Sequence, residues 1–590
     1  MSATTRRFVA DQALTLLRRL KEQNANVVLD AGARQLVRMT IARPLDDDVI
    51  LKAPQRRIAA LKVVGSGLDM SQTATGKTIT TGRAIYHRAA TTIGFRGMVI
   101  VEGRKITQWY EELKLGAPER GLPPLAPNCE VMILDERTPI AAQIRRFHRE
   151  LGPRAGVVLV SNGLMERFHR ELAVIHWHFA VADEAHRYRN TATDAHRALA
   201  QLRFAAIADF WGLTATPKGK EAGNIDVLVG VCVGDRTLIE ERLNSREAGD
   251  LMDEVNAARY RVNYGPHCVR LTKKEMASYL PRVLPAQPMP IEPDPALLEL
   301  LQALREGGRA AFRRLLELIH ELKTLDKHTE LYRNALLEFA SVQGMVLGNV
   351  DRFVDASVDP ETLTHSSSLL AKTLVREGLV AAAMKGGGDG LPLLRGIVAQ
   401  SLAEQAGEEQ ILVFAERVWC LRQLASTVRE RYNVEAHVAD GSTKTREFAE
   451  LRRRFTAGEF PVLCLSPAFH EGHNLQSASG QVHLDIPPVP DPIEQRTGRI
   501  QRIGSPHATV WTSIPYIVGG GTEHMVKIVA PRGGESHQIL DAPEGVSAQE
   551  STIAMMLGAI TSQVAENKEQ EGYIGTAARL RVAARVFGAG

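Results

Sequence analysis

The sequence has few cysteines, no long apolar run and little net charge. Its five cysteines, at positions 129, 232, 268, 420 and 464, form no CxxC pair, so neither a zinc site nor a disulfide framework is readable. No run of about 18 or more apolar residues occurs, and the opening MSATTRRFVADQALTLLRRL lacks the continuous apolar stretch of a signal peptide. We therefore expect a cytoplasmic protein in a reducing compartment, without a membrane partner.

The composition favours a folded chain and leaves its ligands open. Hydrophobic residues make up 44% and charged residues 24% of the chain, near the averages of globular proteins, so we expect a packed interior. A net charge of +4 permits a local phosphate-binding surface but does not by itself indicate one. The length of 590 residues is too great for one core and predicts two to four structural units.

Short apolar, β-branched runs recur in two groups, with helical or loop segments between them. Strands covered on both faces are apolar throughout, so this rhythm predicts doubly wound parallel sheets and an α/β fold. The first group is MVIVE (98–102), VMIL (131–134), VVLV (157–160) and FAVAD (179–183); the second is ILVF (411–414), VLCL (462–465) and VHLDI (482–486).

Between the two groups, strand signals disappear and helical periodicity begins. In REGGRAAFRRLLELIHELKTL the apolar residues from Phe312 to Leu322 fall on one helical face, which predicts an all-helical insertion. The glycine-rich KGGGDG, residues 385–390, marks a joint before the second α/β unit. The predicted segments are an N-terminal helical segment (1–45), lobe 1 (46–240), the helical insertion (241–385), lobe 2 (386–545) and a C-terminal tail (546–590).

The stretch SQTATGKT, Ser71 to Thr78, fits a phosphate-binding loop ending in Gly-Lys-Thr. In such a loop the backbone amides at a helix N-terminus surround phosphate oxygens, the lysine reaches the β and γ oxygens, and the threonine hydroxyl binds Mg²⁺. Ser71 stands where a glycine is usual, which weakens the match. Taken alone, the stretch also fits a chance turn.

The stretch FAVADEAH is an apolar strand that ends in Asp183 and Glu184. One carboxylate at such a strand end can bind the metal while the next polarises an attacking water. The alternative is an acidic strand end that faces solvent. Gln55, in LKAPQRR, lies where a glutamine could read adenine, although a lone glutamine is also common at a surface.

The stretch QRTGRIQRIG carries Arg499 and Arg502 three residues apart. Arginines supplied from a neighbouring domain stabilise the charge that ATP hydrolysis builds on the γ-phosphoryl oxygens, and losing one costs about 10³ to 10⁵ in rate. The alternative is a basic helix face in solvent.

Read in order, these motifs resemble those of the superfamily 2 helicase and translocase motor. The series runs through SQTATGKT, MVIVEGRKITQWYEELKLG, VVLVSNGLM, FAVADEAHRYRN, WGLTATPKG, ILVFAERVWCLRQL, VLCLSPAFHEGHNLQSA and QRTGRIQRIG, over most of residues 50–530. Gln108, Trp109, the LTATP form of its motif and the ending RIG are similar to the SNF-type branch. Family loops carry glycine where Ala74 stands, a departure that looks closer to phage and restriction-type members.

The resemblance implies two RecA-like lobes that hold ATP and Mg²⁺ and contact a nucleic acid. It implies metal and water roles for Asp183 and Glu184. The residues it assigns to nucleotide binding are Gln55, Ser71, Thr75, Gly76, Lys77, Thr78 and Gly472, with Thr78 and Asp183 on the metal. Those assigned to sensing the γ-phosphate are Gln495, Arg499 and Arg502. Those assigned to coupling are His186, Thr214 and Thr216, and those assigned to strand contact are Trp109, Ser161, Asn162, Ser466, Asn474 and Gln476.

Arg305, Arg309 and Arg313 recur at i, i+4 and i+8 in the helical insertion. They form one basic stripe on a helix, which is either a rail for phosphates or a solvated face with acidic neighbours.

The leading hypothesis is an ATP-dependent translocase that moves along double-stranded DNA or resets a protein bound on it. A strand-separating helicase acting on DNA or RNA is a second hypothesis, and an ATP-gated clamp without productive hydrolysis is a third. No accessory domain for chromatin contact is recognisable in the sequence, which favours a stand-alone motor of a bacterium or a phage.

Overall fold

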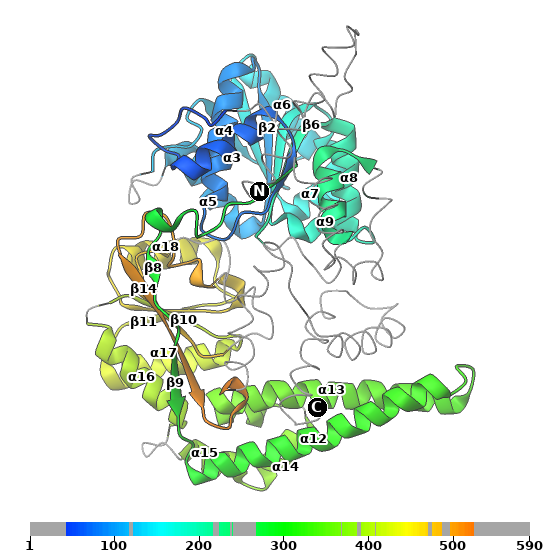
Figure 1. Cartoon of the computed structure of the whole chain (residues 1–590), viewed down its shortest axis with the longest axis vertical. Helices are drawn as coiled ribbons and strands as arrows, with labels where there is room; N and C mark the ends of the chain where they lie inside the picture. Colours follow the sequence, from blue (N-terminus) through cyan, green and yellow to red (C-terminus); the bar gives the residue numbers. More distant parts are fainter. Residues whose placement is uncertain are drawn as a thin grey trace, which may run out of the picture. The chain divides into compact units, whose positions relative to one another are not determined.

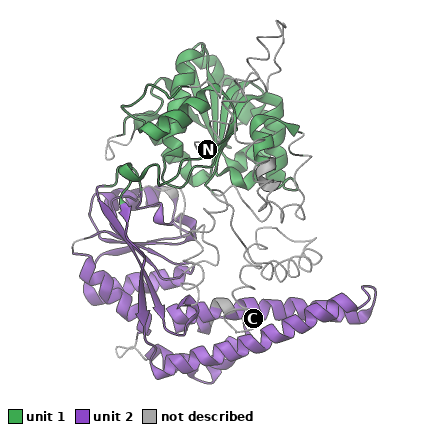
Figure 2. Cartoon of the chain, in the orientation of Figure 1, with its two compact units in different colours: residues 1–281, 502–505 green, residues 282–501, 506–590 purple. Residues whose placement is uncertain are grey.

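The computed structural model of the chain describes residues 43–116, 122–215, 223–236, 239, 267–366, 368–385, 391–407, 409–469, 475–485 and 496–523. Its contacts divide into two compact units (Figure 2). Unit 1 comprises residues 1–281 and 502–505, and unit 2 comprises residues 282–501 and 506–590. The prediction of two parallel-sheet α/β lobes is confirmed, because every strand pair in both units is parallel.

Unit 1 is built on a seven-stranded sheet in the order β3-β4-β2-β5-β6-β1-β7. Its strands are β1 (Gly67–Asp69), β2 (Arg96–Val101), β3 (Cys129–Ile133), β4 (Ala155–Ser161), β5 (Trp177–Asp183), β6 (Ile207–Leu213) and β7 (Cys268–Val269). Its helices are α3 (Ala53–Val64), α4 (Lys77–Thr91), α5 (Ile106–Tyr110), α6 (Ile140–Leu151), α7 (Asn162–Leu172), α8 (Asp194–Ala206) and α9 (Gly223–Val233). Short turns of other helix types lie at η1 (Gly103–Lys105), η2 (Glu111–Leu115), η4 (Ala185–Tyr188) and η6 (Ala277–Tyr279).

Helices cover both faces of this sheet (Figure 1). Ile58 of α3 and Ile85 of α4 pack with Val99 in the core on one face, while Leu164 of α7 and Leu199 of α8 belong to the core on the other face. All six residues of β2 are buried, because a strand covered on both faces has no side exposed to water.

The register of three neighbouring strands aligns two acidic strand ends. Leu213, the last residue of β6, pairs with Asp69 at the end of β1 and with Asp183 at the end of β5. Parallel strands point the same way, so the loops that follow all three leave from one edge of the sheet.

Unit 2 holds the second sheet, in the order β11-β12-β10-β13-β14-β8, with β9 also paired to β14. Its strands are β8 (Arg282–Val283), β9 (Gln287–Ile291), β10 (Ile411–Phe414), β11 (Ala436–Ala439), β12 (Val462–Leu465), β13 (Gly480–His483) and β14 (Thr509–Ile517). Its helices are α12 (Pro295–Thr324), α13 (Glu330–Val358), α14 (Leu369–Arg376), α15 (Leu379–Lys385), α16 (Leu393–Gln405), α17 (Val418–Tyr432) and α18 (Thr445–Thr456), with short turns η7 (Pro360–His365) and η8 (Pro467–Phe469). Across the described ranges, none of the helices is both long and apolar enough to span a bilayer.

The boundary predicted for lobe 1 at residue 240 falls too early. Strand β7 is hydrogen-bonded to β1 at the edge of the first sheet, and unit 1 continues to residue 281. The range expected to be all-helical also contributes β8 and β9 to the second sheet, so the helical part begins at Pro295. Two-residue strands such as β7 and β8 carry too little periodicity to be found in sequence.

The helical part is a hairpin of α12 and α13 whose apolar stripes face each other. Leu300 and Leu315 of α12 and Phe339 of α13 are fully buried and share one core with β10. Arg314 adds two bonds to one carboxylate across the hairpin, from Nε to Glu338 Oε1 at 2.7 Å and from a terminal nitrogen to Oε2 at 2.9 Å.

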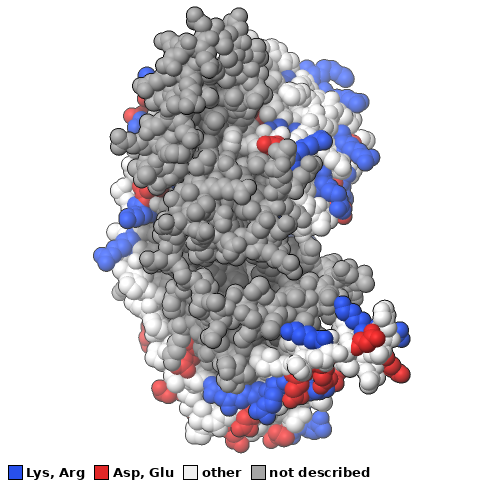
Figure 3. All heavy atoms as spheres, turned by 45° about the vertical axis from the view of Figure 1, so that its right-hand side comes forward, with Lys and Arg blue, Asp and Glu red and all other residues white. Residues whose placement is uncertain are grey.

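The predicted basic stripe on α12 is not a continuous surface. Arg305 is half-buried, donates to the Gly519 carbonyl at 3.0 Å and lies over the ring of Phe353. Arg309 and Arg313 are exposed. Figure 3 shows acidic side chains beside basic ones at the lower end of the view. One of the three arginines therefore serves packing within unit 2.

We expect Phe339→Ala to destabilise unit 2 by about 3 to 5 kcal/mol, because it leaves a cavity between α12 and α13. Hydrogen–deuterium exchange of peptides from both helices would measure the loss of protection. Leu337→Ala, on the same helix but 72% exposed, is the matched control and should exchange like the wild type. Equal protection in the two variants would contradict this account of the hairpin core.

Candidate active site

The phosphate loop predicted at SQTATGKT connects β1 to α4, whose first residue is Lys77. Two of its residues have positive φ, Ala74 at 67° and Gly76 at 93°. Gly76 is the N-cap of α4, so the unpaired amides of the first helical turn face the loop, which is the arrangement that binds phosphate. The departure seen in the sequence at Ala74 thus falls on a backbone conformation that favours glycine.

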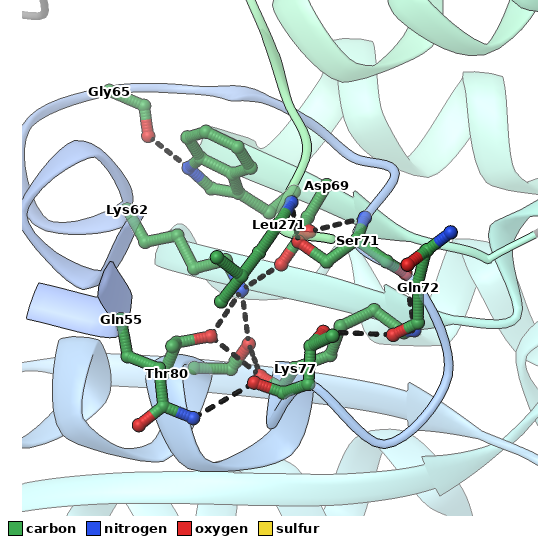
Figure 4. A network of polar contacts seen from close by, with 12 residues as sticks. Gln55, Lys62, Gly65, Asp69, Ser71, Gln72, Lys77, Thr80 and Leu271 are labelled. Carbon is green, nitrogen blue, oxygen red and sulfur yellow. Dashed lines mark hydrogen bonds and ion pairs between the residues drawn. The ribbon is translucent and has the colours of Figure 1, made fainter. Parts of the chain in front are cut away.

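Ser71 stands where the usual first glycine is missing, and its hydroxyl has a structural role. It accepts a hydrogen bond from the Leu271 amide at 3.0 Å, and the Gln72 amide donates to the Leu271 carbonyl at 2.9 Å (Figure 4). The strand segment that follows β7 therefore holds the start of the loop. This support was not predicted, because residues about 200 positions apart in sequence meet only through the sheet.

Gln55 braces the phosphate loop from α3. Its side chain is fully buried, and its amide nitrogen donates to the Thr75 carbonyl at 2.8 Å while its oxygen accepts from the Lys52 amide at 2.9 Å. Both ends of the side-chain amide are thus bonded within the protein. The predicted role of reading adenine would need the second amide hydrogen and the second oxygen lone pair of Gln55, which these two bonds do not use.

A fully buried ion pair lies beneath the loop, between Lys62 of α3 and Asp69 of β1. The Lys62 ammonium is 2.6 Å from Asp69 Oδ2 and donates to the hydroxyls of Thr80 and Thr81, each at 2.9 Å (Figure 4). Asp69 Oδ1 accepts from the Ser71 amide at 2.9 Å. Burial would raise the pKa of Asp69, but Lys62 and Lys77 outweigh burial and lower it. Sequence reasoning missed this pair; its signal is a charged residue inside an apolar stretch.

Lys77 folds back onto its own loop. Its ammonium donates to the Ser71 carbonyl at 2.7 Å and to the Gln72 carbonyl at 3.1 Å, so phosphate oxygens would compete with these carbonyls for it. Burial lowers the pKa of Lys77, and the charges of Asp69, Glu184 and Asp183 oppose that shift. Lys77 therefore interacts electrostatically with Asp183 and Glu184.

Asp183 ends β5, and Glu184, the next residue, has a positive φ of 50°. Such a conformation costs a non-glycine residue about 1 to 2 kcal/mol. Lys105 Nζ lies 2.9 Å from Glu184 Oε1 and 4.0 Å from Asp183 Oδ2. Burial raises the pKa of Asp183, whereas Lys105 and His186 overcome burial at Glu184 and lower its pKa to about 2.

His186 and Thr214, both predicted to couple the cleft to the nucleic acid, are brought together. His186 Nδ1 lies 3.3 Å from the Thr214 hydroxyl and 3.5 Å from Glu184 Oε2. The Thr214 amide donates to the Asp69 carbonyl at 2.9 Å, so this contact also reaches β1. A polar path thus runs from the end of β5 through the end of β6 to the end of β1.

The oxygen donors at this edge of the sheet suit Mg²⁺ that arrives with a nucleotide. Mg²⁺ prefers carboxylate, hydroxyl and phosphate oxygens and usually binds one or two protein ligands. Asp183 and the half-buried Thr78 supply that number. Within the described residues no group of three or more His, Cys, Asp or Glu side chains is placed to hold a metal ion by itself.

The two arginines of QRTGRIQRIG fall in different units. Arg499 is 6% exposed and belongs to unit 2, whereas Arg502 is half-buried and groups with unit 1. Gln495, Gly472, Thr216 and Asn474 lie outside the described residues. Arg496, which was not singled out in sequence, is fully buried in unit 2, where it is 2.9 Å from Glu416 and 3.4 Å from Asp485.

Several side chains predicted to contact a nucleic-acid strand are buried instead. Trp109 is 2% exposed, and its indole N–H donates to Asp183 Oδ2 at 3.3 Å. Asn162 is 4% exposed and accepts from the Tyr188 hydroxyl at 2.9 Å. Ser466 and Gln476 are buried as well, and half-buried Ser161 caps α7 by accepting from the Leu164 amide. Trp109 therefore orients Asp183 and has no exposed surface that a nucleic-acid strand could contact.

Two segments of the chain match models of known protein families. Residues 13–230 match the SNF2-related domain, and residues 393–504 match the helicase conserved C-terminal domain. The chain therefore carries an SNF2-related domain followed by a helicase conserved C-terminal domain. The resemblance seen in the motifs is thereby confirmed, and the same two domains support the prediction of an ATP-hydrolysing enzyme.

Curated relatives match this chain over a limited region. The RNA polymerase-associated protein RapA of Vibrio parahaemolyticus is 34% identical over 122 residues, covering 20% of this chain and 12% of the relative. RapA of Serratia proteamaculans is 31% identical over 171 residues, covering 28% of this chain and 16% of the relative. The chain thus matches less than a fifth of the length of these relatives.

Two solved structures are similar to this chain over most of its length. The Sulfolobus solfataricus SWI2/SNF2 ATPase core in complex with dsDNA has a TM-score of 0.34 at 16% identity, covering 84% of this chain and 93% of that one. The Pyrococcus furiosus Hef helicase domain has a TM-score of 0.47 at 17% identity, covering 82% and 98%.

We expect Lys62→Met to destabilise unit 1 by about 3 to 5 kcal/mol, because Asp69 would remain charged and buried without its partner. The double variant Lys62→Met/Asp69→Asn should recover much of that loss, since the neutral amide can still accept from Ser71. Urea unfolding with exchange measured on β1 and α4 peptides would test this. Arg146→Met, which removes one partner of an exposed pair with Glu150, is the control and should leave stability unchanged. A double variant no more stable than the single would contradict the ion-pair account.

We expect Gly76→Ala to weaken ATP binding about tenfold or more, because the strain of such a residue amounts to about 1 to 3 kcal/mol. A methyl group at Gly76 would lie 2.2 Å from Gln55 Nε2, at a φ of 93°. Ala74→Gly is the matched control at the other positive φ, and it should bind ATP within about twofold of wild type. Titration with a fluorescent ATP analogue would measure both, and tight binding by the Gly76 variant would argue against this loop geometry.

Proposed function

We propose that this chain is an ATP-dependent translocase that moves along double-stranded DNA. The observation that carries the proposal is the register of β1, β6 and β5. It aligns Asp69, where the phosphate loop begins, with Asp183, next to Glu184, at one edge of one sheet. A phosphate-binding lysine and two acids at that edge are the groups that ATP hydrolysis requires.

In the proposed reaction the amides of the loop and Lys77 bind the nucleotide phosphates. Glu184 orients the attacking water and accepts its proton. Thr78 and Asp183 hold Mg²⁺, which neutralises charge on the phosphate oxygens when it is bound. His186, 3.3 Å from Thr214, would relay the state of Glu184 to the end of β6.

The γ-phosphate would be sensed by Gln495, Arg499 and Arg502. Their place in the motif supports this role, since arginines near a transferring phosphoryl group stabilise its charge. Gly472 and Thr216 keep their predicted roles in nucleotide binding and coupling under this proposal.

The nucleic acid would be bound mainly through its phosphates, independently of sequence. The SNF-type motifs of the sequence support duplex DNA as the track, and a protein bound on that DNA is the object that such a motor would displace. Ser161 is one of the described residues predicted to contact the nucleic acid, and it is half-buried. Its place at the end of β4 supports that role. Asn474, outside the described residues, keeps its predicted role in contacting the nucleic acid.

A strand-separating helicase is the second candidate, favoured by the match of residues 393–504 to the helicase C-terminal domain. A fluorescent fork tests unwinding, and displacement of the third strand of a triplex tests translocation without unwinding. An ATP-gated clamp is opposed by Glu184, because a protein that does not hydrolyse ATP has no need of a water-activating acid.

The test is steady-state ATP hydrolysis with no nucleic acid, with single-stranded DNA, with duplex DNA and with RNA. We expect duplex DNA to stimulate the wild type, and we expect Glu184→Gln to lower kcat about 10² to 10⁴-fold, the usual contribution of a general base. Glu150→Gln, on an exposed ion pair of α6, is the matched control and should hydrolyse ATP like the wild type.

Stimulation by single strands alone would favour the helicase. The absence of hydrolysis under all four conditions would refute the motor and leave the clamp.

A further inference from the structure

Lys105 lies against the two acids of the candidate active site, although the motif that contains it gave it no role. It ends η1, directly after β2, and its side chain is 5% exposed. Its ammonium is 2.9 Å from Glu184 Oε1 and 4.0 Å from Asp183 Oδ2. Trp109, four residues further along, donates to Asp183 Oδ2. One short segment therefore contacts both carboxylates.

These contacts conflict with the roles of the two acids in hydrolysis. An ammonium near Asp183 repels a divalent cation, and an ammonium bonded to Glu184 occupies an oxygen that would receive the proton of the attacking water. A buried charge pair is also held more tightly than one in water, because the local dielectric constant is lower.

We propose that Lys105 is a positioning residue that occupies the Asp183–Glu184 pair until the Mg²⁺-bound nucleotide displaces it. This inference rests on the proposed function, since it concerns how the same site is kept from hydrolysing ATP before its ligands are in place. Lys105 and Trp109 lie on one segment, so a shift of that segment changes the surroundings of both acids at once. The segment continues into η2, a five-residue π-helix at Glu111–Leu115, a rare form that is frequent at functional sites.

The test compares binding of a fluorescent ATP analogue in Mg²⁺ with binding in EDTA, using the full chain. The quantity is the Kd in EDTA divided by the Kd in Mg²⁺. A larger value means that Mg²⁺ tightens binding of the ATP analogue more. We expect Lys105→Met to raise this ratio about tenfold, because a cation about 4 Å from a carboxylate changes its affinity for another cation by at least that order. Lys105→Arg keeps the charge and should show the wild-type ratio.

Lys114→Met is the matched control. Lys114 lies in the same segment but pairs with Glu130, at 3.2 Å, and should leave the ratio unchanged. Melting curves provide a readout independent of the fluorophore: Mg²⁺ with ADP should raise the melting temperature of Lys105→Met more than that of the wild type. If Lys105→Met does not fold, Lys105→Gln takes its place in both measurements.

A ratio that stays the same or falls in the Lys105→Met or Lys105→Gln variant would overturn the proposal. So would a ratio in Lys105→Arg that rises as much as in Lys105→Met, because the effect would then not follow the charge. The proposed function is tested separately: it is refuted if the wild type neither binds nor hydrolyses ATP. If the wild type hydrolyses ATP but the Lys105→Met variant has the wild-type Kd ratio, only the role of Lys105 is refuted.

Discussion

Parallel pairing of β1, β6 and β5 is the constraint on which the candidate site depends. Asp69, Leu213 and Asp183 lie in register across these strands, and the Thr214 amide bonds to the Asp69 carbonyl. Because parallel strands end at the same edge, a phosphate loop and a pair of acids more than 100 positions apart in sequence leave the sheet as neighbours. A slip of one residue in either pairing would turn the acids to the other face.

Two buried lysines balance the acids at this edge, and their surroundings differ. Lys62 bonds to a carboxylate and two threonine hydroxyls beneath the phosphate loop, so it fixes the loop to α3 and α4. Lys105 instead contacts the two acids assigned to metal and water. Low dielectric strengthens both pairs, but only the second lies where a nucleotide and its metal bring competing charges.

The helical hairpin is part of the core of unit 2. Leu300 and Phe339 from its two helices share one buried cluster with Ile411 of β10. Arg305 ties α12 to the carbonyl of Gly519, just after β14. The hairpin is therefore continuous with the sheet that it accompanies.

The sequence by itself determined the two parallel-sheet lobes, the phosphate loop and the acidic strand end, because buried strands and a glycine-lysine-threonine turn are local patterns. It also marked Ala74 as a departure from a usual glycine, and the structure gives that residue a positive φ, which favours glycine. Motif order along the chain further identified the family. These features need only neighbouring residues to be read.

Only the tertiary structure decided which side chains meet. It gave Gln55 and Ser71 roles in bracing the loop, buried Trp109 against Asp183, and revealed β7, Lys62 and Lys105 as parts of the site. A side chain's partners depend on strand register and on contacts between residues far apart in sequence. A buried lysine therefore looks like any other lysine until the acid beside it is known.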